Sequence, residues 1–293
     1  MHAVDSGNTC WVFVSDSTES RHIYDVIHAI SVLRDLGVRN DAIRFFTDDP
    51  QAIKYTVAYN CPAPLLISTF DQELANIAGF DYLFITLAGH GGIEGIGHPV
   101  KISSHSLVTA ARSSADTKLV VIAATQCFAG TFNYIDARTE PRIIMFGAAN
   151  LSTSLSTQTS IPQPIPSQVQ GMSLQHWQAN SFMLHLFRWI ANPKDIDGDG
   201  QMTLLDAYKY SGATASGTII DVKPVLFMHA QTLAQKSRQL DEDIQNGVIP
   251  NDAQTMLQAK TLRIQLHQMA SLLHTGQEPW LLHADLARQL VMF

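Results

Sequence analysis

A histidine and a cysteine each follow an apolar stretch of this chain. The run Tyr82–Leu87 leads into Ala-Gly-His-Gly-Gly, which contains His90, and the run Leu119–Ala124 leads into Thr-Gln-Cys, which ends at Cys127. A lone histidine after a strand is usually a hydrogen-bonded loop residue, and a lone cysteine is usually a packed thiol. Together they suit amide cleavage, because an imidazole helps to generate a thiolate and later protonates the departing amine. His90 and Cys127 are therefore our candidate catalytic pair.

Glycines surround the histidine. Gly89, Gly91 and Gly92 leave room for a substrate carbonyl to approach backbone N–H groups closely. Such groups can hold the oxyanion that develops when a carbonyl carbon is attacked. We predict that the N–H groups of Gly91 and Cys127 are the oxyanion donors.

Strand-like and helix-like segments alternate in the first half of the chain. Apolar residues from Ile23 to Leu33 are spaced for one helical face, and Gly37 ends that helix. Strands that are apolar on both faces, with helix-length connections, indicate a parallel sheet covered by helices on both sides. We therefore predict an α/β fold whose strand ends bring His90 and Cys127 into one cleft. The predicted strands are Trp11–Val14, Ile43–Phe46, Tyr82–Leu87, Leu119–Ala124 and Ile143–Phe146.

The composition changes after residue 150. Residues 151–171 are rich in Ser, Thr, Gln and Pro, which predicts a loop of about 20 residues. This loop is either a mobile linker or a segment that contacts the substrate. Helices are expected over residues 182–190 and from near Leu204.

The C-terminal part is predicted to be helical. Two amphipathic helices are expected between about Val225 and Leu273, with a break around residues 247–251. We place one domain over residues 1–222 and a helical extension that packs on it over residues 223–293, ending in an edge strand. A dimer interface or a regulatory surface is the alternative interpretation of these helices, so a homo-oligomer is compatible with the sequence.

The composition disfavours several classes of partner. With 19 basic and 26 acidic side chains, the net charge of −7 disfavours nucleic acid, which requires a surplus of Lys and Arg on one face. No apolar run approaches the ~20 residues that span a bilayer. The strand at Trp11–Val14 leaves no room for a leader before it, so we expect a cytoplasmic protein, or a secreted or periplasmic one whose leader has been removed. The 3 cysteines do not make a disulfide framework, and Cys10 and Cys61 are expected to be packed thiols.

In combination, these segments resemble the superfamily of cysteine peptidases that includes caspases, metacaspases, legumain and the catalytic subunit of the GPI transamidase. The resemblance rests on an apolar strand that ends in His-Gly and another that ends in Gln-Cys, with Ala-Gly shortly after it. It covers residues 10–190 approximately. It implies a caspase-like three-layer sandwich around a mostly parallel sheet. Further segments that match the legumain branch are Arg21-His22, Asp25-Val26, His28-Ala29, Gly37, Ile43, Asp48-Asp49 and Ala148-Ala149-Asn150.

The resemblance also implies roles around a substrate. Arg21 matches the arginine that lines the primary specificity pocket of legumain-like enzymes, although a solvent-facing position at the helix start is the alternative. Asn150 lies in the matching Ala-Ala-Asn segment. Those enzymes have Asn where this chain has Glu19, an acidic residue where it has Thr125, and Asp where it has Gly89. We expect Arg21, Asn150, Glu19 and Thr125 to contact a peptide or protein substrate. The preferred substrate side chain is acidic, amide or basic, according to which of these residues faces the pocket.

Residues 195–206 fit the twelve-residue calcium loop of EF-hands. Carboxylates stand at positions 1, 3 and 5, Gly200 makes the turn at position 6, and a main-chain carbonyl serves at position 7. Position 12 is Asp instead of the usual Glu, which favours weaker Ca²⁺ binding or tolerance of Mg²⁺. A solvated Asp/Gly turn is the alternative. The predicted ligands are Asp195, Asp197, Asp199, the Gln201 carbonyl and Asp206.

These inferences lead to a thiol endopeptidase that works through an acyl-enzyme on Cys127, with His90 as general base and then acid. A transpeptidase, in which an amine resolves the acyl-enzyme, uses the same residues. A calcium-responsive scaffold on a degenerate peptidase fold is the non-enzymatic alternative. Calcium in the loop acts either as a switch or as a structural staple.

Overall fold

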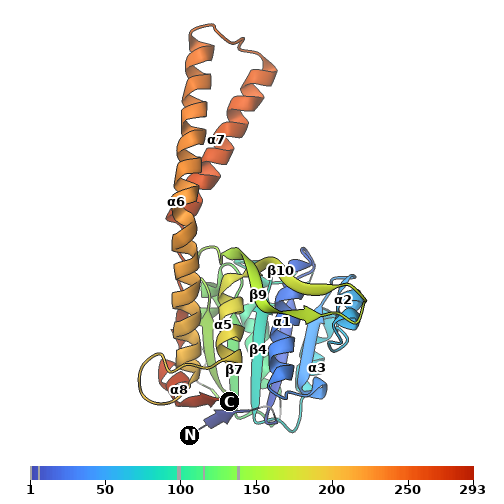
Figure 1. The fold of residues 1–293 in the computed structure, drawn as a ribbon. Coiled ribbons are helices and arrows are strands. Elements are labelled where there is room, and N and C mark those ends of the chain that lie inside the picture. Colours follow the sequence, from blue (N-terminus) through green and yellow to red (C-terminus); the bar gives the residue numbers. More distant parts are fainter. Residues whose placement is uncertain (1, 6, 98–99, 115, 137–138) are drawn as a thin grey trace. The chain divides into compact units, whose positions relative to one another are not determined.

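The computed structural model describes residues 2–5, 7–97, 100–114, 116–136 and 139–293 (Figure 1). The chain forms two compact units. The first comprises Met1–Ala215 with Gln277–Phe293, and the second comprises Ser216–Gly276. The first unit contains every residue that the sequence predicts for catalysis, substrate binding or metal binding.

A six-stranded sheet forms the centre of the first unit. Its strand order is β11-β8-β7-β4-β2-β3, and neighbours are parallel except for β11, which runs antiparallel to β8. All five strands predicted from the sequence are present, and the mostly parallel α/β sheet is confirmed. The six strands are β2 (Thr9–Ser15), β3 (Ile43–Thr47), β4 (Tyr82–Ala88), β7 (Leu119–Ala124), β8 (Arg142–Gly147) and β11 (Trp280–Leu282).

Helices cover both faces of this sheet (Figure 1). Side chains alternate between the faces along each strand, so Trp11 and Phe13 of β2 join one buried cluster while Val12 and Val14 join the other. Helices α1 (Arg21–Asp35) and α5 (Ser181–Ala191) pack in the first cluster, and α3 (Phe70–Ala75) and α4 (Ser104–Arg112) pack in the second. The arrangement is compatible with a three-layer sandwich. Shorter helices are α2 (Ala52–Ala58), η1 (Asn40–Ala42), η2 (Ile67–Thr69) and η3 (Ala129–Asn133).

The order of the strands favours a ligand site at the carboxyl ends of the central strands. Because β3 and β4 lie on opposite sides of β2, the chain changes its direction of progress across the sheet there, and ligands bind at the carboxyl ends of strands beside such a point. Ser15 pairs with Ala88, and Leu87 pairs with Ala124, so β2, β4 and β7 end at the same level. The segments that follow these three strands therefore lie next to one another.

The segment predicted as a long loop is mostly a β-hairpin. Strands β9 (Ser156–Pro166) and β10 (Ser173–Asn180) pair in antiparallel fashion, so the prediction of a loop over residues 151–171 was wrong for most of its length. Ile161, Leu174 and Trp177 are buried in the core, and burial of these few residues outweighs the polar composition. The three prolines of β9 are tolerated because this strand has one partner only, and proline is accommodated at an unpaired strand edge.

The last residues of the chain belong to the first unit. Strand β11 forms the edge of the main sheet, and α8 (Ala284–Gln289) follows it. The predicted final strand is present as β12 (Leu290–Met292), but it pairs with β1 (His2–Val4) in a separate two-stranded sheet and is not an edge of the main one. Strands β5 (Gly91–Gly92) and β6 (Gly95–Ile96) form a short hairpin directly after His90.

The second unit is helical. Helix α6 (Leu204–Gln245) begins in the first unit and is continuous across Pro224, whereas the sequence suggested separate helices here. Helix α7 (Ala253–His274) follows after the predicted break, and Arg263 of α7 lies 2.6 Å from Asp241 of α6. None of the described helices combines the length and the apolar character that crossing a membrane requires.

Candidate active site

Asp16 holds the loop that carries His90. It follows β2 directly, is fully buried, and accepts a hydrogen bond from the backbone N–H of His90. It also accepts hydrogen bonds from the N–H and the hydroxyl of Thr18 at 2.9 and 2.7 Å, and from Nδ1 of His22 at 3.0 Å. A Cβ on Gly89 would lie 2.8 Å from Oδ2 of Asp16, so this carboxylate occupies the space that a side chain at position 89 would need.

The Asp16 carboxylate is ionised although it is buried. Burial raises the pKa of a carboxyl group, but here the hydrogen bonds and the nearby charge of His22, with the hydrogen bonds from Thr18, outweigh burial and hold the pKa of Asp16 well below its usual range. The result is a fixed negative charge beneath the His90 loop.

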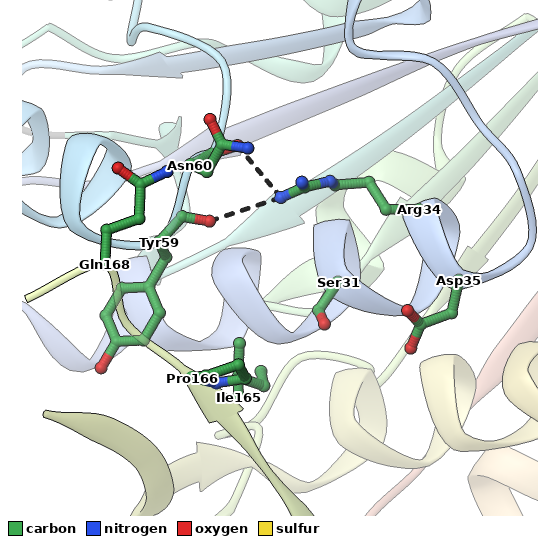
Figure 2. Close-up of a pocket in the computed structure, with 8 residues that line it drawn as sticks. All are labelled: Ser31, Arg34, Asp35, Tyr59, Asn60, Ile165, Pro166 and Gln168. Atoms are coloured by element: carbon green, nitrogen blue, oxygen red, sulfur yellow. Dashed lines mark hydrogen bonds between the residues drawn. The ribbon is translucent and has the colours of Figure 1, made fainter.

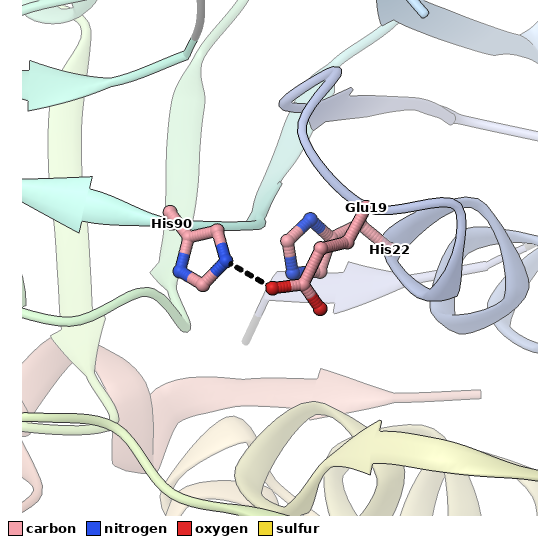
Figure 3. A group of neighbouring side chains, drawn as sticks. All are labelled: Glu19, His22 and His90. Atoms are coloured by element: carbon pink, nitrogen blue, oxygen red, sulfur yellow. Dashed lines mark hydrogen bonds and ion pairs between the residues drawn. The ribbon is translucent and has the colours of Figure 1, made fainter.

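Glu19 contacts the imidazole of His90. Nε2 of His90 lies 2.7 Å from Oε1 of Glu19 (Figure 3). Oε2 of Glu19 pairs with Nε of Arg21. Hydrogen bonds from Arg21 and then from His90 lower the pKa of Glu19 to about 2, so Glu19 is a carboxylate at neutral pH. The sequence placed Glu19 near a substrate, but the structure places it against the candidate catalytic histidine.

The loops that carry His90 and Cys127 lie in direct contact. A Cβ on Gly91 would lie 2.2 Å from the Cys127 carbonyl oxygen, so only a glycine allows this approach of the two backbones. Sγ of Cys127 lies 3.8 Å from the Ser154 carbonyl oxygen, and the side chain is partly exposed. Among the described residues, the N–H of Cys127 has no hydrogen-bond acceptor, which leaves it available as an oxyanion donor.

The backbone after Cys127 turns sharply. Phe128 has a φ of 55°, in the left-handed region that residues with a side chain seldom adopt. Its N–H donates to the Ser152 carbonyl at 2.8 Å, and the N–H of Gly130 donates to the Asn150 carbonyl at 3.0 Å. The segment after β8 therefore fixes the shape of the Cys127 turn. Asn150 is exposed beside this turn, and its backbone carbonyl is part of the support.

Thr125 lies below the site. Its side chain is fully buried, and its hydroxyl donates to the Leu87 carbonyl at 2.6 Å, which joins the end of β7 to the end of β4. This position gives Thr125 a role in joining strands, and it has no exposed surface for a substrate.

Asn180 connects the loop that carries Cys127 to the first helix. Its Nδ2 donates to the Thr125 carbonyl at 2.7 Å and to the Ser154 hydroxyl at 3.2 Å, and its Oδ1 caps α5 by accepting from the N–H of Met183. Its own N–H donates to the buried Asp25 of α1 at 3.3 Å. One buried side chain thus supports both sides of Cys127.

Arg21 lies between the His90 site and the β9–β10 hairpin. Its Nη1 donates to the Ser156 hydroxyl at 2.8 Å, and its side chain is 21% exposed. The alternative of a solvent-facing residue therefore does not hold. Arg21 is a partly buried cation that joins the first turn of α1 to the start of β9.

The two other cysteines are unsuited to nucleophilic attack at neutral pH. Burial raises the pKa of the Cys10 thiol to about 12 and that of the Cys61 thiol to about 11. Both are free, as is Cys127. The position of Cys127 at the end of β7 distinguishes it from these packed thiols.

The structure brings five predicted residues together and adds others that the sequence analysis missed. Glu19, Arg21, His90, Gly91 and Cys127 gather at the carboxyl ends of β2, β4 and β7, where adjacent strands end level. Two of the missed residues had a signal: Asp16 lies two residues after a predicted strand, and Asn180 lies two residues before a predicted helix and is of a type favoured for capping. Gln277 had none, because it reaches the Ala148 carbonyl from a part of the chain 129 residues away.

The predicted calcium loop presents three carboxylates to one point. Oxygens of Asp195, Asp197 and Asp199 lie within 4.8 Å of one another. Both carboxylate oxygens of Asp197 are buried and have no hydrogen-bond partner among the described residues, although Arg288 and Lys209 lie 3.5 and 3.7 Å away. Such an arrangement suits a hard cation with oxygen ligands.

Asp206 is placed differently from these three. It is fully buried, and its oxygens accept hydrogen bonds from the N–H groups of Ile196, Asp197 and Thr203 and from the Thr203 hydroxyl. These four contacts close the loop and cap the start of α6. The predicted role of Asp206 as a metal ligand would require some of these contacts to be exchanged.

A pocket of about 470 Å³ lies at the far end of α1 (Figure 2). Arg34 donates from Nη1 to the carbonyls of Tyr59 and Asn60, at 3.4 and 3.0 Å. Arg34 stands thirteen residues after Arg21 on the same helix, which is about 20 Å along the axis. This pocket is therefore separate from the His90 and Cys127 site.

No protein-family model and no curated protein sequence matches this chain.

Proposed function

We propose that this chain is a cysteine peptidase of the caspase–legumain type with a caspase-like fold. The observation that carries the proposal is the contact between the His90 and Cys127 loops, in which only a glycine at position 91 allows the two backbones to approach. The level ends of β4 and β7 and the free N–H of Cys127 support it further.

In the proposed mechanism, Cys127 attacks the carbonyl carbon of a peptide bond as a thiolate. His90 takes the thiol proton and later gives it to the departing amine. The N–H groups of Cys127 and Gly91 hold the oxyanion of the tetrahedral intermediate. Water then releases the acyl group from Cys127, and His90 acts as the base for this second step.

Glu19 acts as the third member of the site in this mechanism. A carboxylate 2.7 Å from Nε2 orients the imidazole with Nδ1 free for the thiol and stabilises the imidazolium that forms. Arg21 shares the Glu19 charge, and we propose that its remaining N–H groups contact the substrate side chain before the cleaved bond.

The calcium loop is proposed to bind Ca²⁺ through Asp195, Asp197 and Asp199, with the Gln201 carbonyl, and Mg²⁺ also suits the site. Both oxygens of Asp197 are buried without a hydrogen-bond partner among the described residues, and Arg288 and Lys209 approach Oδ2 alone, so a cation would compensate the charge of the three aspartates further.

The peptidase proposal is tested by labelling the folded protein with a library of peptidyl acyloxymethyl ketones. The number of covalent labels is read from the mass of the intact protein. We expect one label on the wild type, located on Cys127, and none on Cys127→Ala. Cys61→Ala is the matched control and retains the label, because the Cys61 thiol has a raised pKa. The library member that reacts fastest identifies the side-chain preference.

Other outcomes contradict the proposal or narrow it. Folded wild-type protein that takes up no label, with or without Ca²⁺, would instead support a non-catalytic scaffold. If labelling succeeds, addition of a peptide amine during turnover separates hydrolysis from transpeptidation: a ligated product identifies a transpeptidase.

A further inference from the structure

Glu19, His22 and His90 form a cluster with the chemistry of a metal site. One ligand atom of each lies within 4.8 Å of those of the other two (Figure 3). Two imidazole nitrogens and one carboxylate oxygen match the His₂Glu set that binds Zn²⁺ with a fourth position left open. The three side chains come from the segments after β2 and β4, which end side by side in the sheet.

His22 is oriented as a metal ligand. Its side chain is 2% exposed, and its Nδ1 donates to Oδ1 of Asp16 at 3.0 Å. Because Nδ1 is engaged by Asp16, Nε2 is the ring nitrogen that remains to bind a metal. Histidine ligands of zinc commonly donate their second nitrogen to a carboxylate in this way, which orients the ring and raises its basicity.

The other two ligands are free to adjust. The side chains of Glu19 and His90 are 45% and 49% exposed, and their nearest atoms are 2.7 Å apart. Tetrahedral Zn²⁺ with bonds of about 2.0 to 2.2 Å holds its ligands about 3.3 Å apart, so modest side-chain rotation closes the cluster. The rings of His22 and His90 already meet edge to face, with their centroids 5.0 Å apart.

We infer that Glu19, His22 and His90 bind Zn²⁺, with Nε2 of each histidine and one oxygen of Glu19 as ligands. On binding, the proton of the neutral His90 ring moves from Nε2 to Nδ1 by exchange with solvent, and the metal takes the place of the Glu19–His90 hydrogen bond. Bound zinc holds both His90 and Glu19, so it inhibits any reaction that needs His90 as a base. The metal site does not depend on the proposed peptidase activity, whereas the inhibition rests on it.

Zinc binding is measured by isothermal titration of metal-free protein, without substrate and with Ca²⁺ in excess to fill the acidic loop. We expect one Zn²⁺ per wild-type chain. His22→Asn retains an N–H that can donate to Asp16 but removes the ligand nitrogen, and we expect affinity to fall roughly tenfold or more. Glu19→Gln, at an exposed side chain, should give a similar loss. The matched control His105→Asn removes an exposed histidine elsewhere and leaves affinity unchanged.

Cys127→Ser and substitution of Zn²⁺ by Co²⁺ test whether the thiol of Cys127 is itself a metal ligand. We expect Cys127→Ser to retain zinc affinity within about threefold, and the Co²⁺ complex to show no thiolate charge-transfer band. Folded wild type that binds no zinc, unchanged affinity in both His22→Asn and Glu19→Gln, or a thiolate band that disappears in Cys127→Ser would overturn the inference. Slower acyloxymethyl ketone labelling of Cys127 under saturating zinc then tests the inhibition, while labelling without zinc tests the peptidase proposal by itself.

Discussion

Nε2 of His90 lies 2.7 Å from Oε1 of Glu19, a residue from the turn after a different strand. The carboxylate supplies a hydrogen-bond acceptor and a negative charge beside the imidazole. Arg21 balances part of that charge on the other oxygen, so the carboxylate is held between a fixed cation and the imidazole.

Substitution of Glu19 should lower the rate of the chemical step. Glu19→Gln retains an oxygen acceptor but removes the charge that stabilises the imidazolium, and Glu19→Ala removes both. We expect kcat/KM to fall roughly 10- to 100-fold for Glu19→Gln and further for Glu19→Ala. The measurement is turnover of the fluorogenic substrate that matches the preferred ketone.

Glu242→Gln provides the matched control for this substitution. Glu242 is exposed on α6, in the second unit, so its substitution should leave kcat/KM unchanged. Equal rates for wild type, Glu19→Gln and Glu19→Ala would show that Glu19 has no part in orienting His90.

Substitution of Asp16 should affect stability as well as activity. Asp16→Asn removes a buried charge that accepts hydrogen bonds from Thr18, His22 and His90, and hydrogen bonds to charged groups contribute about 1.5 to 3 kcal/mol each. We expect a loss of about 3 kcal/mol in the free energy of unfolding near neutral pH, measured by urea denaturation.

The pH dependence identifies the cause of this loss. Because the pKa of Asp16 is lowered in the folded state, its stabilisation is present above the unfolded pKa of about 3.9 and is lost as pH falls through the lower folded value. The difference between wild type and Asp16→Asn should therefore narrow as pH falls below about 4. A difference that stays constant with pH would mean that Asp16 acts through packing alone.

The sequence predicted that His90 and Cys127 lie on neighbouring loops because strand ends are visible in it. His90 and Cys127 each follow a strand that is apolar on both faces. The carboxyl ends of parallel strands lie on the same side of the sheet. Glu19, by contrast, was assigned to the substrate. Its contact with His90 depends on how the turn between β2 and α1 folds, and hydrophobic periodicity does not encode a turn.

The β9–β10 hairpin is a second feature that the sequence did not predict, because it depends on contacts between distant segments. The Ser, Thr and Pro of residues 156–166 indicate a loop, and the strand forms because Ile161, Leu174 and Trp177 have a buried surface to cover. Much of that surface belongs to α1, which packs on β10 and is far away in the sequence. Tertiary burial outweighed local composition, and local composition was the only signal available.

Asp25 should make stability depend on pH in the opposite direction to Asp16. Burial raises the pKa of Asp25 to about 7, against smaller opposing effects of the hydrogen bonds from Trp177 and Asn180. A group with a raised folded pKa contributes stability that is present below the unfolded pKa and is lost as pH rises through the folded one. We therefore expect wild-type stability to fall between about pH 4 and pH 7 because of this group.

Asp25→Asn tests this expectation. Oδ1 of an asparagine can accept the same two hydrogen bonds, so the neutral side chain fits the site without the cost of a buried charge. Each pKa unit corresponds to about 1.4 kcal/mol, so the variant should gain on the wild type by a few kcal/mol between about pH 4 and pH 7. Parallel stability curves for the two proteins, measured by urea denaturation across this range, would contradict the assignment.

The acidic loop should bind Ca²⁺ and stabilise the protein. At a Ca²⁺ concentration about 100 times the dissociation constant, binding raises the free energy of unfolding by about 2.7 kcal/mol. Asp197→Asn should abolish this gain, because it removes the buried charge that a cation would compensate. Without Ca²⁺ this variant should be about as stable as the wild type, since the reduced repulsion among the three aspartates offsets the loss of the ion pairs with Arg288 and Lys209.

Substitution of Asp206 distinguishes the effect of metal binding from the stability of the loop itself. Its carboxylate already accepts hydrogen bonds from Ile196, Asp197 and Thr203, so Asp206→Asn should lower the unfolding free energy by about 1 to 3 kcal/mol whether or not Ca²⁺ is present. The two variants therefore differ in stability without metal, and thermal denaturation in EDTA and in excess Ca²⁺ distinguishes them. If Asp206→Asn were harmless in EDTA and lost the whole Ca²⁺ gain, Asp206 would be a metal ligand, and its hydrogen bonds would be exchanged on binding. If neither the wild type nor Asp206→Asn responded to Ca²⁺ or Mg²⁺, the three aspartates would form a solvated turn.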